Sequence, residues 1–354
     1  MSGNRTLAMI VAAVLVMGDA RRVQADDPSE DPDSTAGEVE APSDWNLPMK
    51  TLGGRQFWGD VRFFHDWRIQ QNVFSGHHRL LDGKDVRQAW GTLEACEQRL
   101  EEIRIERSLP PMSGKAVILV HGIVRSSKSF DPMKNELRAA GYEVFGFDYP
   151  STRVEIPEAA AYLRQCIDSL DGITEINFVV HSMGGLVVRA SLAESRDPRI
   201  RRMVMLGVPN LGARMANILQ KNYLYRAVYG PAGQQLVEDP NGLIAKLPTP
   251  DFEFALISGA RGTPGGYNPL IPGDDDGTVS LEATRLPGAR DFMTVQALHS
   301  LIMRNPEAIA ATRRFLWTGV LRESGRREPV PEADAATQGS PANPQAEPPT
   351  TPTP

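Results

Sequence analysis

The stretch FVVHSMGGLVV, residues 178–188, places a serine and two glycines between two apolar runs. The run INFVV at 176–180 is typical of a buried strand, and residues 184–193 have the pattern of a helix. A strand-to-helix turn this tight strains the backbone of Ser182 and lifts its hydroxyl off the sheet, while the glycines clear the space behind it. The pattern therefore predicts a nucleophile at Ser182. A serine that only caps the helix is the alternative.

One position in this stretch departs from the usual Gly-x-Ser-x-Gly pattern. Val180 stands where that pattern has its first glycine, a place usually held by a small residue. A valine there must either point into a gap or push the helix aside. We expect a slightly displaced helix after Ser182, with the nucleophile retained.

Apolar runs on both sides of this stretch alternate with segments of helical pattern. The predicted strands are 116–120, 142–149, 176–180, 202–208, 254–258 and 292–298. The predicted helices are 131–140, 157–170, 184–193 and 306–317. Near-continuous apolar strands that alternate with helices indicate an α/β fold with a mostly parallel central sheet and helices on both faces. We expect one folded domain over residues 45–322.

Two segments of this domain lie outside the alternating pattern. Residues 45–110 are expected to form an N-terminal covering region, a flap of strands and helix on the core. It should hold one or two short strands within 57–69 and a long amphipathic helix over 86–103. Residues 211–250 contain an apolar helical stretch, and they form either a cap over the site or an ordinary crossover helix with a long loop.

A serine hydroxyl needs a base to become a good nucleophile, and the chain has six histidines. His181 adjoins Ser182, so at a strand end the two side chains point in opposite directions. His121 ends another predicted strand. His299 follows the strand at 292–298 in a loop that can reach over the edge of the sheet, so we predict that it is the general base. An ordinary surface histidine is the alternative.

The base in turn needs a carboxylate that orients its ring and stabilises the imidazolium. The loop PGDDDGTVS at 272–280 offers Asp274, Asp275 and Asp276. Asp276 precedes a turn into a short apolar anchor that would hold its carboxylate, so we predict that it is the acid. The chain order serine, aspartate, histidine then fits a known arrangement on α/β sheets. The acidic loop could otherwise be a solvated turn or a calcium site.

Attack on a carbonyl group also requires hydrogen-bond donors for the developing oxyanion. The segment HGI at 121–123 lies where the first predicted core strand ends, and we predict that the Ile123 N–H is one donor. The N–H of Met183, next to the nucleophile, is the other. Loss of one such donor typically costs roughly 2.7–4 kcal/mol of transition-state stabilisation. A simple strand-ending turn is the alternative for this segment.

Composition narrows the classes of function. The 354 residues carry a formal net charge of −6 with no basic block, which argues against a nucleic-acid-binding surface. Two cysteines are too few for a disulfide scaffold. Cys96 and Cys166 both fall on apolar stripes of predicted helices, and they are either core residues or one bridge. The chemistry predicted above needs no cofactor and no metal ion.

Both ends of the chain are expected to lie outside the folded domain. Residues 1–25 have the layout of a secretory signal, with Arg5, an apolar run over 7–17 and small residues after it. Because the run is short for a bilayer span, we expect an exported protein, periplasmic or secreted, with an uncleaved membrane anchor as the alternative. Residues 26–44 are predicted to be an acidic linker and 323–354 a disordered, Pro-rich tail.

Together these motifs resemble the α/β-hydrolase superfamily, in particular its lipase and esterase branch. The resemblance rests on HGI (121–123), VVHSMGG (179–185), GVPNLGA (207–213), DDGTVS (275–280) and LPGARDFMTVQALHSLI (286–302). The last two segments are similar to the acid and base segments of bacterial lipases of the lipase class 2 type. The resemblance covers roughly residues 115–317 and leaves the Trp-rich region at 45–110 unexplained.

The resemblance implies an ester hydrolase. Ser182 would be the nucleophile, His299 the general base and then acid, and Asp276 its orienting partner, while the backbone N–H groups of Ile123 and Met183 would form the oxyanion hole. The implied substrate is an acyl ester or a lipid, with transient contact with a lipid surface and no nucleic-acid partner. An acyltransferase or amidase with the same residues, and a non-catalytic binding protein with the hydrolase fold, are the alternatives. The oligomeric state stays open.

Overall fold

The computed structural model describes residues 49–50 and 55–332. The predicted signal (1–25) and acidic linker (26–44) lie outside the described residues, as does the chain from residue 333 onward. Within the described part, no helix combines the length and the apolar character needed to cross a membrane.

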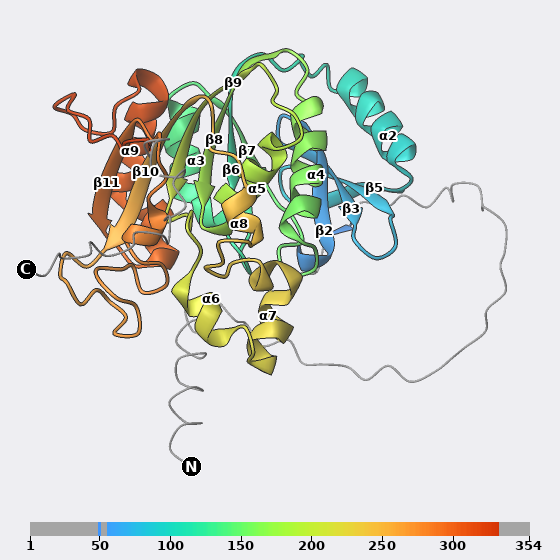
Figure 1. Cartoon of the computed structure of the whole chain (residues 1–354). Helices are drawn as coiled ribbons and strands as arrows, with labels where there is room; N and C mark the ends of the chain where they lie inside the picture. The colour runs from blue at the N-terminus through green and yellow to red at the C-terminus, as the bar shows by residue number, and fades with distance from the viewer. Residues whose placement is uncertain (1–48, 51–54, 333–354) are drawn as a thin grey trace, which may run out of the picture.

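A six-stranded sheet forms the centre of the molecule, in the order β11-β10-β9-β8-β6-β7 (Figure 1). Its strands are β6 (Gly114–Val120), β7 (Glu143–Phe147), β8 (Ile173–His181), β9 (Ile200–Leu206), β10 (Glu253–Ala260) and β11 (Asp291–Gln296). Every neighbouring pair is parallel, so the carboxyl ends of all these strands meet at one edge. The predicted α/β fold with a mostly parallel central sheet is confirmed.

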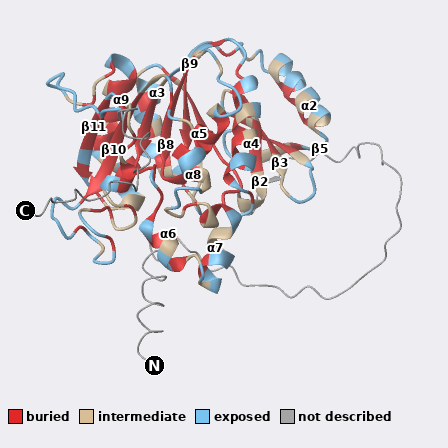
Figure 2. Ribbon diagram, viewed as in Figure 1, coloured by how far each residue is buried: buried red, intermediate tan, exposed pale blue. Residues whose placement is uncertain are grey.

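Helices cover both faces of this sheet. They are α3 (Asp131–Ala139), α4 (Ile156–Asp168), α5 (Met183–Leu192) and α9 (Pro306–Thr318). On β6, Val117 and Leu119 belong to the core that α3 and α9 cover, whereas Ile118 and Val120 belong to the core under α4 and α5. Alternate side chains of a strand point to opposite faces, so a strand covered on both sides is apolar throughout. Figure 2 shows the buried residues concentrated in these strands and in the helix faces against them.

A second, antiparallel sheet precedes the parallel one. It has the order β1-β5-β4-β3-β2 and consists of β1 (Met49–Lys50), β2 (Trp58–Phe64), β3 (Trp67–Asn72), β4 (His78–Leu81) and β5 (Val86–Gly91), with the short turn η1 (Arg55–Phe57) before β2. Strand β2 packs against α4, where Gly59 lies against the ring of Tyr162. Helix α2 (Leu93–Glu106) covers β4 and β5. Figure 1 shows this N-terminal sheet beyond α4, at the side of the molecule.

The N-terminal region was predicted only in part. The strands expected within 57–69 are confirmed, but the long helix expected over 86–103 is wrong in its first part, because residues 86–91 form β5. Helix α2 begins only after Thr92, whose backbone is extended and whose hydroxyl accepts the N–H of Ala95. The apolar residues of β5 continue the helical spacing of α2 by coincidence, so periodicity could not separate the two elements.

The crossover between β9 and β10 contains three helices, α6 (Arg214–Leu219), α7 (Tyr223–Gln234) and α8 (Leu243–Lys246). In Figure 1, α6 and α7 lie at the end of the molecule toward which the strand arrows point. Helix α7 is kinked at Gly230, which has φ 61° and whose backbone lies against the carbonyl of Thr152. Short helical turns elsewhere are η2 (Ser127–Phe130), η3 (Glu282–Thr284) and η4 (His299–Arg304). Helices α6 and α7 of the segment 211–250 (the cap segment), predicted as either a cap or an ordinary crossover, therefore lie at the carboxyl edge of the sheet.

The folded chain continues past residue 322, the expected end of the domain. The carboxylate of Asp291, at the start of β11, accepts the backbone N–H groups of Leu321 and Glu328, each at 2.9 Å. Nη1 of Arg322 also lies 2.9 Å from this carboxylate. Residues 323–332 therefore belong to the folded domain and not to the predicted tail.

The two cysteines are core residues. Cys96 on α2 and Cys166 on α4 are both free and fully buried. Burial raises the pKa of the Cys96 thiol to about 12 and raises that of Cys166 well above its usual range. Of the two interpretations of this pair, the bridge is the one that the structure contradicts.

Candidate active site

Ser182 occupies the turn between β8 and α5. Its backbone has φ 53° and ψ −130°, a conformation that residues with a side chain rarely adopt. Helix α5 begins at the next residue, so the turn has no spare length. The side chain is buried except for a small accessible part, with the residue 7% exposed. The strained strand-to-helix turn that the sequence predicts is present.

Glycines make this turn sterically feasible. A Cβ on Gly184 would lie 2.7 Å from the carbonyl oxygen of His121, and one on Gly185 would lie 2.5 Å from Cγ2 of Val208. Val180, in the place of the usual first glycine, is fully buried in the core. The close approach of helix to strand therefore falls on Gly184 and Gly185, and the displacement expected from Val180 stays a prediction.

The structure brings Ser182, His299 and Asp276 together in one chain of hydrogen bonds. Nε2 of His299 lies 2.9 Å from Oγ of Ser182, and Nδ1 of His299 lies 2.7 Å from Oδ2 of Asp276. With a carboxylate facing Nδ1, the ring proton belongs on Nδ1, and Nε2 is free to accept the proton of the serine. This arrangement can raise the nucleophilicity of Ser182 Oγ.

Asp276 is held rigidly for this contact. It is 1% exposed, and its second carboxylate oxygen accepts the backbone N–H groups of Thr278 at 3.0 Å and Val279 at 2.8 Å. The short apolar anchor that the sequence indicated is Val279, which is buried. The bonds to the backbone leave Oδ2 to face His299.

The two neighbouring aspartates have other partners. Asp274 accepts the backbone N–H groups of Arg261 and Gly262, both at 2.9 Å. Asp275 accepts those of Asn268 at 3.0 Å and Gly277 at 2.6 Å. These carboxylates stabilise the loop itself. The described residues also hold no group of three or more His, Cys, Asp or Glu side chains that could bind a metal ion.

His181 lies behind His299. Its Nε2 lies 2.9 Å from the backbone oxygen of His299, and the two ring centroids are 4.7 Å apart. Burial lowers the pKa of His181 well below its usual range, and the nearby His299 lowers it further. A neutral His181 can therefore donate to the His299 carbonyl without adding charge next to the base. The sequence indicates only that His181 points away from Ser182, because no sequence pattern signals a contact across 118 positions.

The predicted oxyanion segment lies beside the nucleophile. A Cβ on Gly122 would lie 2.9 Å from Cβ of Ser182, so the turn that contains Ile123 approaches the serine directly. His121 is buried and stacks on Tyr149, with ring centroids 4.4 Å apart. The N–H of Met183, the first residue of α5, has no acceptor within its own helix. The Met183 N–H thus adjoins Ser182, and the turn that carries Ile123 lies beside the serine, while the oxyanion role of both N–H groups stays a prediction.

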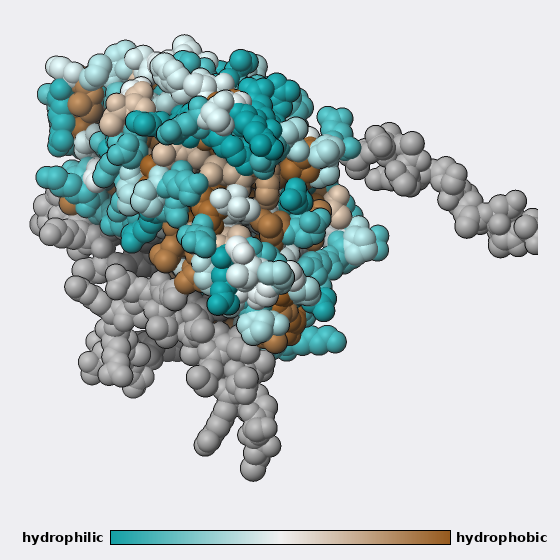
Figure 3. Space-filling view, turned by 90° about the vertical axis from the view of Figure 1, so that its left-hand side faces the viewer, coloured by the Kyte–Doolittle hydropathy of each residue, from teal (hydrophilic) through white to brown (hydrophobic). Residues whose placement is uncertain are grey.

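Large apolar side chains are exposed on the segments that follow the strands. They include Leu211, Ile218, Tyr223, Leu224, Tyr267, Leu270 and Leu301. These residues belong to the cap segment, to the loop after β10 and to η4, and each of these follows the carboxyl end of a strand. Figure 3 shows one face of the molecule, where brown residues interrupt the teal surface chiefly in its middle and lower parts.

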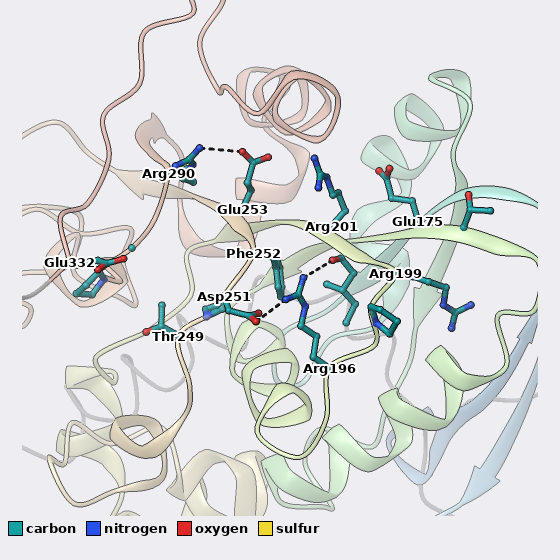
Figure 4. A pocket seen from close by; sticks show the side chains of 16 residues that line it. Glu175, Arg196, Arg199, Arg201, Thr249, Asp251, Phe252, Glu253, Arg290 and Glu332 are labelled. Carbon is teal, nitrogen blue, oxygen red and sulfur yellow. Dashed lines mark hydrogen bonds and ion pairs between the residues drawn. The ribbon is translucent and has the colours of Figure 1, made fainter.

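A cavity of about 920 Å³ lies at the opposite edge, where β8, β9 and β10 begin. Its lining is charged: Figure 4 shows Arg196 pointing toward Asp251 and Arg290 toward Glu253. The lining contains neither a serine nor a histidine. Parallel α/β sheets hold their reactive groups at the carboxyl edge, so this cavity is not the candidate active site.

Comparison with protein families and curated proteins gives distant matches. Residues 78–237 match a family described as a domain of unknown function (DUF7379). That span contains Ser182 and the turn at 121–123, but neither Asp276 nor His299. The chain is 27% identical over 207 residues to the lysosomal thioesterase PPT2 of Homo sapiens and 27% identical over 205 residues to that of Bos taurus. These matches cover 48% and 47% of this chain but only 66% and 64% of the relatives, just under two thirds of their length.

Solved structures give matches of lower identity. The lipase BlEst2 of Bacillus licheniformis in its mature form superposes with a TM-score of 0.44 at 20% identity, over 59% of this chain and 93% of that one. A metagenomic carboxyl esterase, MGS0156, superposes with a TM-score of 0.41 at 16% identity, over 54% of this chain and 66% of that one.

Proposed function

We propose that this protein is a serine ester hydrolase that acts through an acyl-enzyme. The proposal is carried by the hydrogen-bonded chain from Ser182 through His299 to Asp276, with the serine in a strained turn. The similarity to proteins named as thioesterases agrees with this class, because esters and thioesters are both cleaved by attack on an acyl carbonyl.

In the proposed reaction, Nε2 of His299 takes the proton of Ser182 as Oγ attacks the ester carbonyl. Asp276 stabilises the imidazolium that forms. The oxyanion accepts the N–H groups of Ile123 and Met183. His299 then protonates the leaving alcohol, and the acyl group stays on Ser182 until water, activated by the same imidazole, releases the acid.

We propose an acyl ester or a lipid as the substrate. The exposed apolar side chains on the cap segment and the loop after β10 supply contact area for an acyl chain, or for a lipid surface that presents one. In this proposal the segment 211–250 acts as the cap that shapes the acyl pocket. The net charge of −6 gives no reason to invoke a nucleic acid.

A fluorophosphonate probe tests the nucleophile. We expect the wild-type protein to be labelled and the Ser182→Ala variant to stay unlabelled at the same protein concentration. A wild type that resists labelling, or equal labelling of the variant, would overturn the proposal. A panel of nitrophenyl esters of increasing chain length, extended by an acyl thioester, then measures the preferred substrate. Competing alcohols and amines separate hydrolysis from acyl transfer by the products formed.

We also propose that the protein is exported. The proposal rests on the sequence alone, namely on Arg5 and the apolar run over 7–17 that small residues follow. Mass spectrometry of the protein recovered outside the cytoplasm should find an N-terminus close to residue 26. Recovery of the intact chain from membranes would instead favour the uncleaved anchor.

A further inference from the structure

The turn at 121–127, which carries Ile123, is held in place from outside the parallel sheet. We propose that the N-terminal sheet is a positioning element for this turn, with Gln56 and Arg68 as its positioning residues. The inference rests on the proposed function, because it concerns the oxyanion donor of that reaction. It gives a role to the region at 45–110 that the family resemblance leaves unexplained.

Gln56, in η1, binds the middle of the turn. Its Nε2 donates to the carbonyl oxygen of Arg125 at 3.5 Å, and its Oε1 accepts the hydroxyl of Ser151 at 3.1 Å. The same Ser151 oxygen accepts the backbone N–H of Val124 at 3.1 Å. Oε1 of Gln56 also accepts the N–H and the hydroxyl of Thr152, at 3.2 and 3.1 Å. One glutamine side chain therefore joins the turn to the loop after β7.

Val124 shows why the turn needs such support. It is the residue after Ile123, and its φ of 59° lies in the left-handed region that a β-branched residue avoids. Such a conformation persists only where surrounding contacts enforce it. The bond from the Val124 N–H to Ser151, which Gln56 secures, is one of these contacts.

Arg68, on β3, acts on the far end of the turn through Asp148. Oδ1 and Oδ2 of Asp148 accept the backbone N–H and the hydroxyl of Ser127, at 2.7 and 2.9 Å. Nη1 of Arg68 donates to Oδ2 of the same carboxylate at 2.8 Å. The ion pair fixes the carboxylate on which the end of the turn depends.

Behind this ion pair, Asp60 on β2 binds the backbone of Asp148 with its side chain and with its own backbone. Asp60 is fully buried; its carboxylate Oδ2 accepts the N–H of Asp148 at 2.7 Å, and its backbone N–H donates to the Asp148 carbonyl at 2.8 Å. Gln70 donates to Asp60 at 2.7 Å and accepts Arg79 at 2.7 Å. The network therefore runs from three strands of the N-terminal sheet through Asp148 to the turn at 121–127.

Both attachments act on residues that follow Ile123, while β6, which ends at Val120, holds the chain before it. Ile123 therefore lies between two fixed points, which set the direction of its N–H. A donor that is displaced by about 1 Å can lower a rate by roughly a hundredfold. Loosening the turn should therefore weaken stabilisation of the oxyanion, while Ser182, His299 and Asp276 keep their mutual geometry. A loss of oxyanion stabilisation with unchanged geometry of Ser182, His299 and Asp276 is expected for a positioning role, whereas a merely structural role would disturb the whole site.

The test compares Gln56→Ala with Gln88→Ala. Gln88 lies on β5 of the same sheet, is also partly buried, and donates to Asp82, within the β4–β5 hairpin. Both variants are assayed on a nitrophenyl ester and on its thionoester, in which sulfur replaces the carbonyl oxygen. Sulfur is a weak hydrogen-bond acceptor, so the N–H groups of Ile123 and Met183 stabilise the transition state of the thionoester less than that of the ester. We expect Gln56→Ala to lower kcat on the ester by roughly tenfold to a hundredfold, with a small change in KM and a smaller loss on the thionoester.

A second measurement does not depend on activity. Amide hydrogen exchange at Val124 and Ser127 should be faster in Gln56→Ala and unchanged in Gln88→Ala. Ser127→Ala tests the other attachment, because it removes the hydroxyl bond to Asp148. It is preferred to a variant of Arg68, because loss of that cation would leave two buried carboxylates unpaired and unfold the protein.

The outcomes separate this inference from the proposed function. Equal losses on ester and thionoester, or unchanged exchange in Gln56→Ala, would overturn the positioning role. A wild type that cleaves neither substrate, together with faster exchange in Gln56→Ala, would overturn the proposed function and the catalytic part of this inference, and would leave the dependence of the turn on the N-terminal sheet standing.

Discussion

His299 is hydrogen-bonded to Asp276 through both its side chain and its backbone. Nδ1 of His299 lies 2.7 Å from the Asp276 carboxylate, and the His299 N–H donates to the Asp276 carbonyl at 2.8 Å. One aspartate therefore fixes both the ring and the loop that carries it. The ring cannot turn away from Ser182 without breaking the bond to the carboxylate.

Asp276→Asn should lower kcat on the order of 10⁴-fold, because an amide can donate to Nδ1 and so favour the ring tautomer that cannot accept the serine proton. The matched control is Asp274→Asn, two residues away, whose carboxylate accepts the backbone N–H groups of Arg261, Gly262 and Asp275. We expect its kcat to stay close to that of the wild type. Steady-state kinetics on a nitrophenyl ester checks both, and a loss in Asp274→Asn as large as in Asp276→Asn would contradict the assignment.

The strands and the candidate site residues could be predicted because each leaves a local pattern in the sequence. Residues 116–120 are fully buried on both faces, so the strand appears in the sequence as an unbroken apolar run. Ser182 and His299 each follow such a run, and parallel strands deliver their carboxyl ends to one edge. Periodicity and strand order were therefore sufficient to bring these residues together.

The contacts that support the site could not be predicted in this way. Gln56 and Arg125 are 69 positions apart, and His181 and His299 are 118 apart. A polar side chain in such a contact belongs to no periodic pattern. Which residue it meets depends on how distant parts of the chain pack together in the folded protein. The boundary between β5 and α2 was missed for a related reason, since it depends on the cap formed by Thr92 and not on the apolar spacing.

The strain at Ser182 should be measurable as stability. Ser182→Gly should have a higher free energy of unfolding than Ser182→Ala by about 1 kcal/mol, because glycine adopts φ 53° and ψ −130° freely while alanine keeps the strain of about 1–3 kcal/mol. The greater freedom of glycine in the unfolded chain, about 0.4–1 kcal/mol, reduces the difference. Urea unfolding of the two inactive variants measures it. Equal stabilities would argue against a strained turn.

The contact between α5 and the end of β6 should tolerate no additional atom. We expect Gly184→Ala to destabilise the fold by at least about 2 kcal/mol, because the new Cβ would meet the backbone oxygens of Val120 and His121, which cannot move aside. Gly265→Ala is the control, since a Cβ there meets nothing within 4 Å, and we expect a change within about 1 kcal/mol. Thermal unfolding checks both. A Gly184→Ala variant as stable as the wild type would contradict this prediction. It would mean that α5 can move away from β6, in line with the displaced helix that we expect from Val180.

The buried pair Asp60 and Arg68 should make stability depend on pH. Burial raises the pKa of Asp60 to about 7 against the lowering effect of Arg68, and Asp148 raises it further. Asp60 also faces Gln70, which donates to it, the guanidinium of Arg79 on β4, and the thiol of Cys166 on α4.

Because its folded pKa lies above the usual 3.8, the folded state binds the Asp60 proton more tightly than the unfolded state does. This contribution to stability is fully present below about pH 4 and is lost as the pH rises through about 7. The free energy of unfolding of the wild type, measured relative to Asp60→Asn by urea denaturation, should therefore fall between pH 5 and pH 8. A difference that does not change with pH would mean that Asp60 stays ionised throughout, with Arg68 outweighing its burial.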